Sequence, residues 1–331
     1  MTEKSYSFHF QNSSFSSPAI GTSVIITGAV HGNETCGTQA IRRVIDELEN
    51  GSLQIVAGKL TLVPVCNPLA YQQGTREGER NLNRRLIPTD DVREFEDHVA
   101  NWLCPLLAQH EVLLDLHSFR SQGDPFVLIG PENNRGPLES FSHARHELAM
   151  AMRLGVHRLV DGWLSTYARG VERRQLRLSH GADARAVANA DTRFGVGTTE
   201  YMRSVGGYAM TLECGQHLDP HAPEVAYQAI INTLRHLGVI AGAAPRPVDV
   251  MEALRIYDVI DKFHADDSFV REWRSFDELR EGDLIGIRAD GTEVRADKGG
   301  RIIFPDAGAA EGEEWFYLTM PNPRLQSGGA A

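Results

Sequence analysis

Short apolar runs alternate with helical patterns between residues 20 and 245, and this alternation restricts the possible folds more than any other feature. Residues 23–30, 60–65 and 112–116 are apolar runs of strand length. Strands without polar alternation are typically buried on both faces. Apolar side chains at positions 41, 44, 45 and 48 follow the spacing of a helix that buries one side. The pattern predicts an α/β fold in which a mixed, mostly parallel sheet is flanked by helices.

The remaining chain up to residue 245 continues this alternation, with one exception. Helices are predicted at 95–107, 142–154 and 224–237, and strands at 126–129 and 208–212. Residues 181–207 differ, since they are rich in Gly, Ala, Asp, Arg and Thr and have weak periodicity. We interpret them as a long loop or a mobile lid near a site, although a surface loop without function fits this composition equally well.

A change of pattern near residues 241–247, Ala-Gly-Ala-Ala-Pro-Arg-Pro, predicts a domain boundary. Beyond it, short strand-like runs are separated by turns such as Asp290-Gly291, which is a typical hairpin signal. We therefore expect a catalytic domain over residues 1–243 and a small all-β C-terminal domain over residues 244–331.

Composition excludes several classes of protein. The 331 residues carry 33 Lys and Arg against 44 Asp and Glu, a net charge of −11, and 42% are hydrophobic. Such a chain is neither disordered nor basic enough to suggest nucleic-acid binding. It contains no apolar run of about 18 residues for a membrane span and no recognisable targeting segment. Four cysteines without a CxxC pair favour a reducing compartment, so we expect a cytoplasmic protein; its oligomeric state is not readable.

Polar residues follow three of the predicted strands directly. His31 and Glu34 come after the first strand, His117 ends the strand at 112–116, and Glu213 ends the strand at 208–212. Ligands of open α/β sheets bind at the carboxyl ends of the strands. Two imidazoles with one carboxylate would leave a coordination position of zinc open, and the other carboxylate could act on the water bound there. Any one of these residues alone is more often a structural residue or a chance match.

A second polar cluster follows the strand at 60–65. It contains Asn67-Pro68, Arg76 and the run Asn81-Leu82-Asn83-Arg84-Arg85. Guanidinium groups bind carboxylates and oxyanions in a bidentate manner, so the cluster suggests an anion pocket. A solvated polar loop is the alternative.

Four motifs in this order resemble the succinylglutamate desuccinylase/aspartoacylase family of zinc carboxypeptidase-like hydrolases. They are Gly-Ala-Val-His-Gly-Asn-Glu at residues 28–34, the Asn-Pro, Arg and Asn-Arg elements within residues 67–84, Asp-Leu-His at 115–117 and Glu-Cys-Gly at 213–215. The resemblance covers roughly residues 23–240. It implies a zinc carboxypeptidase-like catalytic fold.

The resemblance also implies the chemistry of the site. One Zn²⁺ per chain would be held by His31, Glu34 and His117. Glu213 would be the general base and later the general acid, and Arg76 would stabilise the oxyanion. The implied reaction is hydrolysis of the amide bond of a small anionic N-acyl amino acid.

The substrate carboxylate would be bound by Asn83 and Arg84. Arg203 would add to this anion site, because it lies ten residues before Glu213, where aspartoacylases also have an Arg. Many relatives have Asp where this chain has Asn81. Tyr317 in the C-terminal region would either reach the substrate or pack in the core.

Three alternatives remain open at the level of sequence. The same site could serve a metallocarboxypeptidase that acts on short peptides, or it could cleave esters. A non-catalytic binding protein with a structural zinc is the third, but structural zinc usually has four protein ligands. The sequence does not identify the acyl group or the amino acid, and two imidazoles with a carboxylate also bind Mn, Fe or Co.

Overall fold

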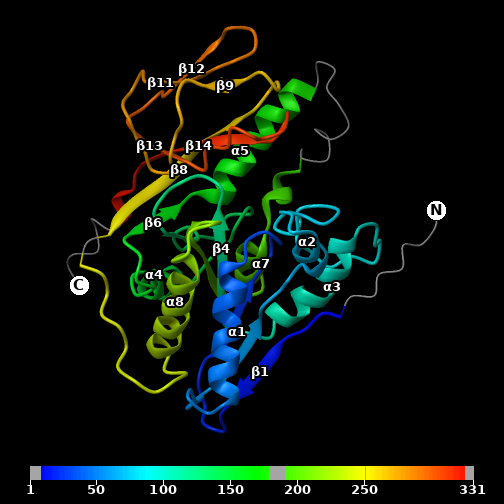
Figure 1. Cartoon of the computed structure of the whole chain (residues 1–331), viewed down its shortest axis with the longest axis vertical. Helices are drawn as coiled ribbons and strands as arrows, with labels where there is room; N and C mark the ends of the chain where they lie inside the picture. The colour runs from blue at the N-terminus through cyan, green and yellow to red at the C-terminus, as the bar shows by residue number, and fades with distance from the viewer. Residues whose placement is uncertain (1–8, 179–190, 250, 325–331) are drawn as a thin grey trace.

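The computed structural model describes residues 9–178, 191–249 and 251–324, and its centre is a large twisted sheet with helices on both faces (Figure 1). Eleven strands form this sheet in the order β1-β3-β2-β4-β7-β5-β6-β8-β14-β13-β10, and β12-β11-β9 form a second sheet of three strands. The strands are β1 (Ser13–Ser16), β2 (Ser23–Gly28), β3 (Lys59–Val63), β4 (Val112–Phe119), β5 (Phe126–Leu128), β6 (Arg158–Asp161), β7 (Tyr208–Gln216), β8 (Glu252–Asp261), β9 (Ser268–Phe269), β10 (Glu278–Leu279), β11 (Leu284–Ile287), β12 (Glu293–Arg295), β13 (Gly300–Ile303) and β14 (Glu314–Pro321). The helices are α1 (Cys36–Glu49), α2 (Pro68–Gln73), α3 (Phe95–Leu107), α4 (Ala144–Ala151), α5 (Trp163–Leu178), the 3₁₀ helix η1 (Thr192–Gly195), α7 (Thr198–Ser204) and α8 (Ala222–His236).

The central strands are buried on both faces, as their composition predicts. Along β2, Val24 and Ile26 pack into a core with α1 and α8, which lie side by side in Figure 1, whereas Ile25 packs into a second core with α3. Successive side chains of a strand point to opposite faces, so a continuous apolar run serves both layers. This is the α/β architecture expected from the sequence.

The expectation of a mostly parallel sheet is not confirmed for the sheet as a whole. Parallel pairing joins β3 to β2, β2 to β4, β4 to β7, β5 to β6 and β6 to β8. The other five neighbouring pairs are antiparallel. Parallel pairing therefore dominates only near the centre, where helices cover both faces, and the edges are closed by antiparallel strands.

The C-terminal region is built from strands in its described part, but the main sheet runs into it without a break. Strand β8, which the sequence analysis did not predict, pairs in parallel with β6, and β14, β13 and β10 follow it. Phe126 and Val160 share a core with Leu254, Ile256 and Tyr317 from beyond the predicted boundary. The boundary at residue 243 therefore does not coincide with a break in the sheet.

The predicted loop or lid at 181–207 is only partly described, since residues 179–190 lie outside the described part of the chain. From residue 191 onward the expectation of a loop is wrong, because η1 and α7 follow each other directly. Met202 of α7 is fully buried in the core with α3. Backbone N–H groups of Arg85 and Leu86 donate to the carbonyls of Phe194 and Val196 at 2.7 and 2.9 Å. Tertiary contacts thus stabilise a segment whose own periodicity is weak.

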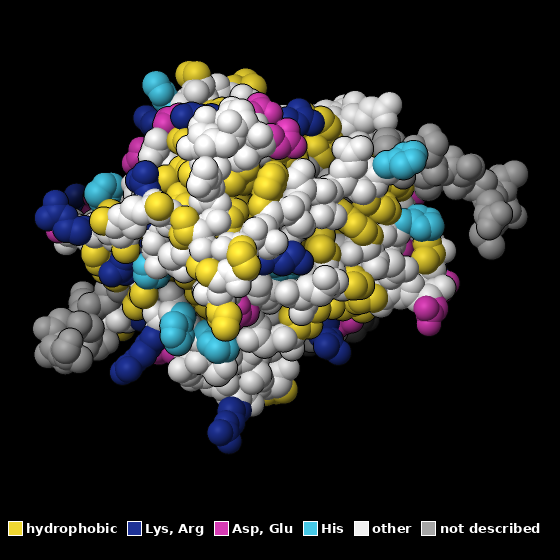
Figure 2. Space-filling model, turned by 90° about the horizontal axis from the view of Figure 1, so that it is seen from below, with side chains coloured by type: hydrophobic (Ala, Val, Ile, Leu, Met, Phe, Trp, Pro, Cys, Tyr) yellow, Lys and Arg dark blue, Asp and Glu magenta, His cyan; other side chains and the backbone are white. Residues whose placement is uncertain are grey.

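Two general expectations can be compared with the surface and the cysteines. On the face shown in Figure 2, the described Lys and Arg side chains are scattered rather than gathered into one basic patch. Among the residues that the structure describes, no helix is both long and apolar enough to cross a membrane. All four cysteines are buried free thiols.

Candidate metal centre and active site

The carboxyl ends of β2, β4 and β7 bring the predicted ligands and the predicted base to one edge of the sheet. These strands are neighbours and run parallel, with Thr27 of β2 in register with Asp115 of β4. His117 of β4 is in register with Glu213 of β7. His31 and Glu34 lie in the turn that follows β2. Parallel pairing of three consecutive strands therefore produces the cluster expected from the sequence.

His31, Glu34 and His117 form a buried group of the size that a metal ion requires. Nδ1 of His31 lies 2.8 Å from Oε1 of Glu34, and Nδ1 of His117 lies 2.9 Å from Oε2 of the same carboxylate. One ligand atom from each residue lies within 4.8 Å of the others. None of the three is more than 3% exposed. Two imidazoles and a carboxylate fit zinc, which prefers nitrogen ligands together with carboxylate oxygen.

The turn that carries His31 and Glu34 is shaped by close packing at Gly32. A Cβ atom at this position would lie 2.0 Å from the carbonyl carbon of Ala70 in α2, so only glycine fits. The turn is closed by a hydrogen bond from the Glu34 N–H to the His31 carbonyl, 3.1 Å long. This backbone course places the two side chains on one side, three residues apart.

A second set of residues orients the two imidazoles. Nε2 of His31 lies 3.1 Å from Oδ1 of Asn81, and Nε2 of His117 lies 2.8 Å from Oδ2 of Asp115. Both oxygens accept, so Nε2 of each ring donates to them, and Nδ1 is the nitrogen on the Glu34 side whose lone pair a metal ion would take. Such outer partners are usual for histidines that bind metals. Asn81 was expected within the polar cluster and as a departure from relatives, but its contact with His31 was not predicted.

Asp115 is itself held by two hydroxyl groups. Thr27 donates to Oδ1 at 2.6 Å, and Thr198, at the start of α7, donates to Oδ2, the oxygen that also contacts His117. Burial alone would lower the pKa of His117, but the charges of Asp115 and Glu34 raise this pKa well above its ordinary value. In the absence of a metal the cluster therefore favours a proton on His117, and metal binding must displace it.

Glu213 lies next to this group, and its carboxylate forms no ion pair with another residue that the structure describes. Its Oε2 is buried and has no hydrogen-bond partner among the described residues. Burial raises the pKa of Glu213 to about 8, although the positive charge of His117 opposes the shift. A buried carboxylate oxygen without a partner is rare in proteins and commonly marks a place for water, an ion or substrate.

Arg76 is close to the metal ligands, as predicted. Its Nη1 lies 3.0 Å from Oε1 of Glu34, and its side chain is 45% exposed. The loop that carries it is anchored by Glu96 of α3, which is fully buried and accepts hydrogen bonds from the backbone N–H groups of Gly78 and Arg80 at 3.0 and 3.1 Å. Nothing in the sequence marks Glu96 for this role, because a glutamate in a helical pattern normally faces solvent.

The Asn-Pro motif of the second cluster has a structural role. Asn67 is fully buried, and its side chain accepts a hydrogen bond from the N–H of Ala70 and so caps α2, where Pro68 occupies the first position. Its amide group also donates to Glu96 at 2.8 Å. The motif thereby joins α2 to the loop that carries Arg76.

Asn83 and Arg84 continue the same loop. Oδ1 of Asn83 accepts a hydrogen bond from the N–H of Thr198 at 3.0 Å. Arg84 is buried, and its guanidinium carbon lies 5.0 Å from the ring centre of Trp163 and 5.4 Å from that of Tyr167. These two residues are therefore fixed beside Asn81, which contacts the metal ligand His31.

Arg203 lies elsewhere, and its predicted role in substrate binding is not supported. It is buried, and its guanidinium contacts Glu139 at 2.8 Å, Glu147 at 3.1 Å and Glu200 at 3.4 Å. It also donates to the carbonyl of Ala209 at the start of β7. That position is four residues before Glu213, or roughly 13 Å along a strand. These carboxylates balance its charge, which favours a structural role, and its part in substrate binding stays a prediction.

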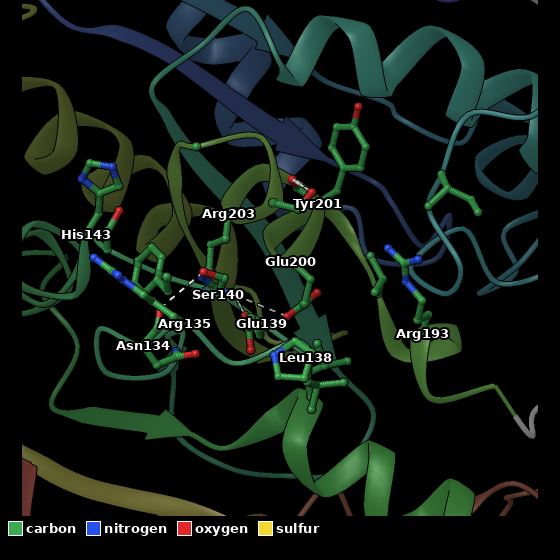
Figure 3. Close-up of a pocket in the computed structure, with 18 of the residues that line it drawn as sticks. Asn134, Arg135, Leu138, Glu139, Ser140, His143, Arg193, Glu200, Tyr201 and Arg203 are labelled. Carbon is green, nitrogen blue, oxygen red and sulfur yellow. Dashed lines mark hydrogen bonds and ion pairs between the residues drawn. The ribbon is translucent and has the colours of Figure 1, made fainter.

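A cavity of about 940 Å³ lies beside this arginine (Figure 3). It is bounded by the loop at 133–143 and by α7, with Glu139, Glu200 and Arg203 among its lining residues. None of the three metal-ligand candidates lines it. The cavity is thus distinct from the predicted reaction centre.

Tyr317 is in the core, as one of the two predicted possibilities requires. It is 4% exposed, and its ring centre lies 5.3 Å from that of Trp163. Burial raises the pKa of Tyr317 well above its ordinary value.

Glu314, three residues earlier in β14, approaches Arg84 and was not predicted. No signal in the sequence distinguishes it from the neighbouring Glu311 and Glu313.

Comparison with known proteins identifies the class that this fold and site define. The model of the succinylglutamate desuccinylase/aspartoacylase catalytic domain matches residues 20–237, so the chain belongs to this family of deacylases. The succinylglutamate desuccinylase of Pseudomonas syringae pv. tomato is 23% identical over 317 residues, which cover 91% of this chain and 84% of that protein.

Solved structures show the same fold. The product-bound ectoine utilization protein EutE (DoeB) from Ruegeria pomeroyi matches with a TM-score of 0.69 and 17% identity, over 93% of this chain and 88% of that one. The succinylglutamate desuccinylase from Vibrio cholerae matches with a TM-score of 0.66 and 20% identity, over 92% and 82%.

Proposed function

We propose that this chain is a zinc-dependent deacylase that hydrolyses the amide bond of a small N-acyl amino acid. One observation carries the proposal: three buried ligand groups converge within 4.8 Å beside a buried carboxylate whose Oε2 has no partner among the described residues. His31, Glu34 and His117 would hold the metal. When bound, zinc would supply a Lewis acid and lower the pKa of water.

Glu213 is the residue best placed to move protons. It would accept a proton from the attacking water and pass it to the nitrogen of the leaving amine, as a general base and then a general acid. Burial raises the pKa of Glu213, and a carboxyl group with a raised pKa holds an accepted proton long enough to pass it on. Amide cleavage needs this return of the proton, since an unprotonated amine is a poor leaving group.

Arg76 and the loop at 81–84 would position the substrate. The Arg76 guanidinium is 45% exposed while it contacts Glu34, so it can turn toward the acyl carbonyl and donate to the oxygen that becomes negative. Asn83 and Arg84 would bind the carboxylate of the amino acid part. In Asn83 the amide oxygen is already occupied by Thr198, which leaves its NH₂ group for the substrate.

A hydrolysis screen with metal analysis tests this proposal. We expect about one zinc per purified chain, because one open site is proposed. We also expect release of a free carboxylic acid from N-acyl amino acids. Release of C-terminal amino acids from short peptides instead would indicate a metallocarboxypeptidase. Tight binding of N-acyl amino acids without any turnover would overturn the enzymatic proposal.

A further inference from the structure

Arg84 faces a carboxylate of its own chain without a direct hydrogen bond to it. Nη2 of Arg84 lies 4.0 Å from Oε1 of Glu314. This distance is an ion pair but exceeds hydrogen-bond length. Nη1 donates to the Asn83 carbonyl at 2.9 Å, and within the described part of the chain Nε and Nη2 make no hydrogen bond. Arg84 therefore keeps donors for a ligand while a negative charge stands next to it.

The other arginine near Glu314 already has a strong partner. Arg174 of α5 binds Asp261 through two hydrogen bonds of 2.6 and 3.0 Å, and its contact with Glu314 is longer, at 3.4 Å. Arg174 and Asp261 thus largely neutralise each other. Arg84 and Glu314 remain as a loosely joined pair of opposite charges.

The carboxylate of this pair is the more accessible partner. The side chain of Glu314 is 24% exposed, against 9% for Arg84. Burial would raise the pKa of Glu314, but the charges of Arg84 and Arg174 lower it below its ordinary value. Glu314 is therefore ionised at neutral pH and open enough to meet a ligand.

The pair also stands beside the proposed reaction centre. Arg84 is three residues from Asn81, whose side chain contacts His31. The charge of Arg76, which contacts Glu34, acts on Glu314 and on Glu213 alike. A substrate carboxylate held by Arg84 would therefore lie close to Glu314.

We infer that Arg84 and Glu314 select a substrate whose amino acid part carries a carboxylate and an ammonium group next to each other. A diamino acid acylated on its side-chain nitrogen, with the α-carboxylate and α-ammonium free, is the simplest such substrate. The inference rests on the proposed deacylase function. A dicarboxylic amino acid would bring a second negative charge toward Glu314, whereas the zwitterion satisfies both residues.

Two acetylated probes that share the acyl group test this selection. Nδ-acetylornithine offers the free carboxylate and ammonium pair, and Nα-acetylglutamate offers two carboxylates. With the zinc-loaded protein we expect kcat/KM to favour acetylornithine by at least about tenfold, the effect of one well-placed charge contact. A preference for acetylglutamate would overturn the inference and leave the deacylase function intact.

Single substitutions distinguish the contribution of Arg84 from that of Glu314. Glu314→Gln should raise KM for acetylornithine by about tenfold or more, with little change for acetylglutamate. Arg84→Gln should weaken both probes, because both carry a carboxylate. Glu311→Gln, at an exposed position just before β14, should leave the preference unchanged. Equal losses on both probes in Glu314→Gln would show that Glu314 is only structural, and would overturn the inference.

A binding measurement needs neither catalysis nor a variant. Calorimetric titration of the wild-type protein should show that ornithine binds at least about tenfold more tightly than 5-aminopentanoate, which lacks the α-ammonium group. Equal affinities would overturn the inference even if Glu314→Gln does not fold. If the expected binding difference is found but no N-acyl amino acid is hydrolysed, the proposed deacylase function is overturned and the binding inference stands.

Discussion

Two buried charge clusters lie at opposite ends of β7, and they differ in how completely their polar groups are satisfied. At the start of the strand, Arg203 is surrounded by three carboxylates and a backbone carbonyl. Toward the other end, Glu213 keeps an oxygen that has no partner among the described residues, beside three potential metal ligands. A saturated cluster holds elements together, whereas an unsaturated one is prepared for a ligand. Whether all polar atoms of a buried cluster have partners therefore distinguishes a structural cluster from a functional site better than residue type does.

The largest expected effect is on kcat and concerns Glu213, the carboxylate with an oxygen that has no partner in the described part of the chain. Glu213→Gln should reduce kcat by about 10²- to 10⁴-fold, the usual contribution of a general acid–base residue. Thermal unfolding and zinc content should change little, because the lost oxygen has no partner to release.

Glu147→Gln provides the matched control, since Glu147 is also a buried carboxylate but has the Arg203 guanidinium as its partner. It should lower stability and leave kcat of the folded protein near the wild-type value. Full activity in Glu213→Gln would refute the proposed role of this carboxylate.

At the saturated end, Arg203→Met should reduce the free energy of unfolding by about 3–5 kcal/mol, because it leaves buried carboxylates without their cation. Urea unfolding measures this loss, and Arg193→Met at an exposed position is the control. KM of the folded fraction should not change. A higher KM with unchanged stability would restore the substrate-binding role that the sequence suggested.

An intermediate effect on zinc affinity is expected for Asn81, which contacts the metal ligand His31 but is not itself a proposed ligand. Asn81→Ala should weaken zinc binding by about 10- to 100-fold, because His31 loses the acceptor that orients its ring. Competition with a chromogenic chelator measures the affinity. Asn81→Asp retains an acceptor oxygen and should bind zinc nearly as well as the wild type; an equal loss in both variants would contradict this explanation.

The smallest effect is a pH dependence of the saturated cluster. Burial raises the pKa of Glu139 to about 7, although Arg203 opposes the shift. A raised folded-state pKa means that protonation favours folding, so this contribution is present below the ordinary value of 4.5 and disappears as the pH rises to about 7.

Glu139→Gln should therefore flatten the decrease of unfolding free energy between about pH 5 and about pH 7. Urea titrations at several pH values measure this slope, with the exposed Glu132→Gln as control. An unchanged slope would show that Glu139 is ionised throughout this range.

Much of the fold and the centre of the site could be predicted from local sequence. His31, Glu34, His117 and Glu213 were predicted together because each follows an apolar strand, and parallel strands place their carboxyl ends at one edge. Arg203 lies near the start of β7 rather than beside Glu213, because sequence spacing measures chain length and not which end of a strand a side chain reaches. The helix α7 was missed because its stability comes from contacts with α3 and the loop at 81–86 rather than from its own periodicity.

The sequence by itself determined the α/β architecture, the four chemical groups at the strand ends and the family, because apolar periodicity and motif spacing are local properties of the chain. The tertiary structure alone decided which polar groups are satisfied. Asn81 meets His31 and Glu314 meets Arg84 only because distant segments pack together, with β14 joined to the main sheet through β8. Satisfaction of a buried charge depends on partners across the fold, and no pattern within a short window contains them.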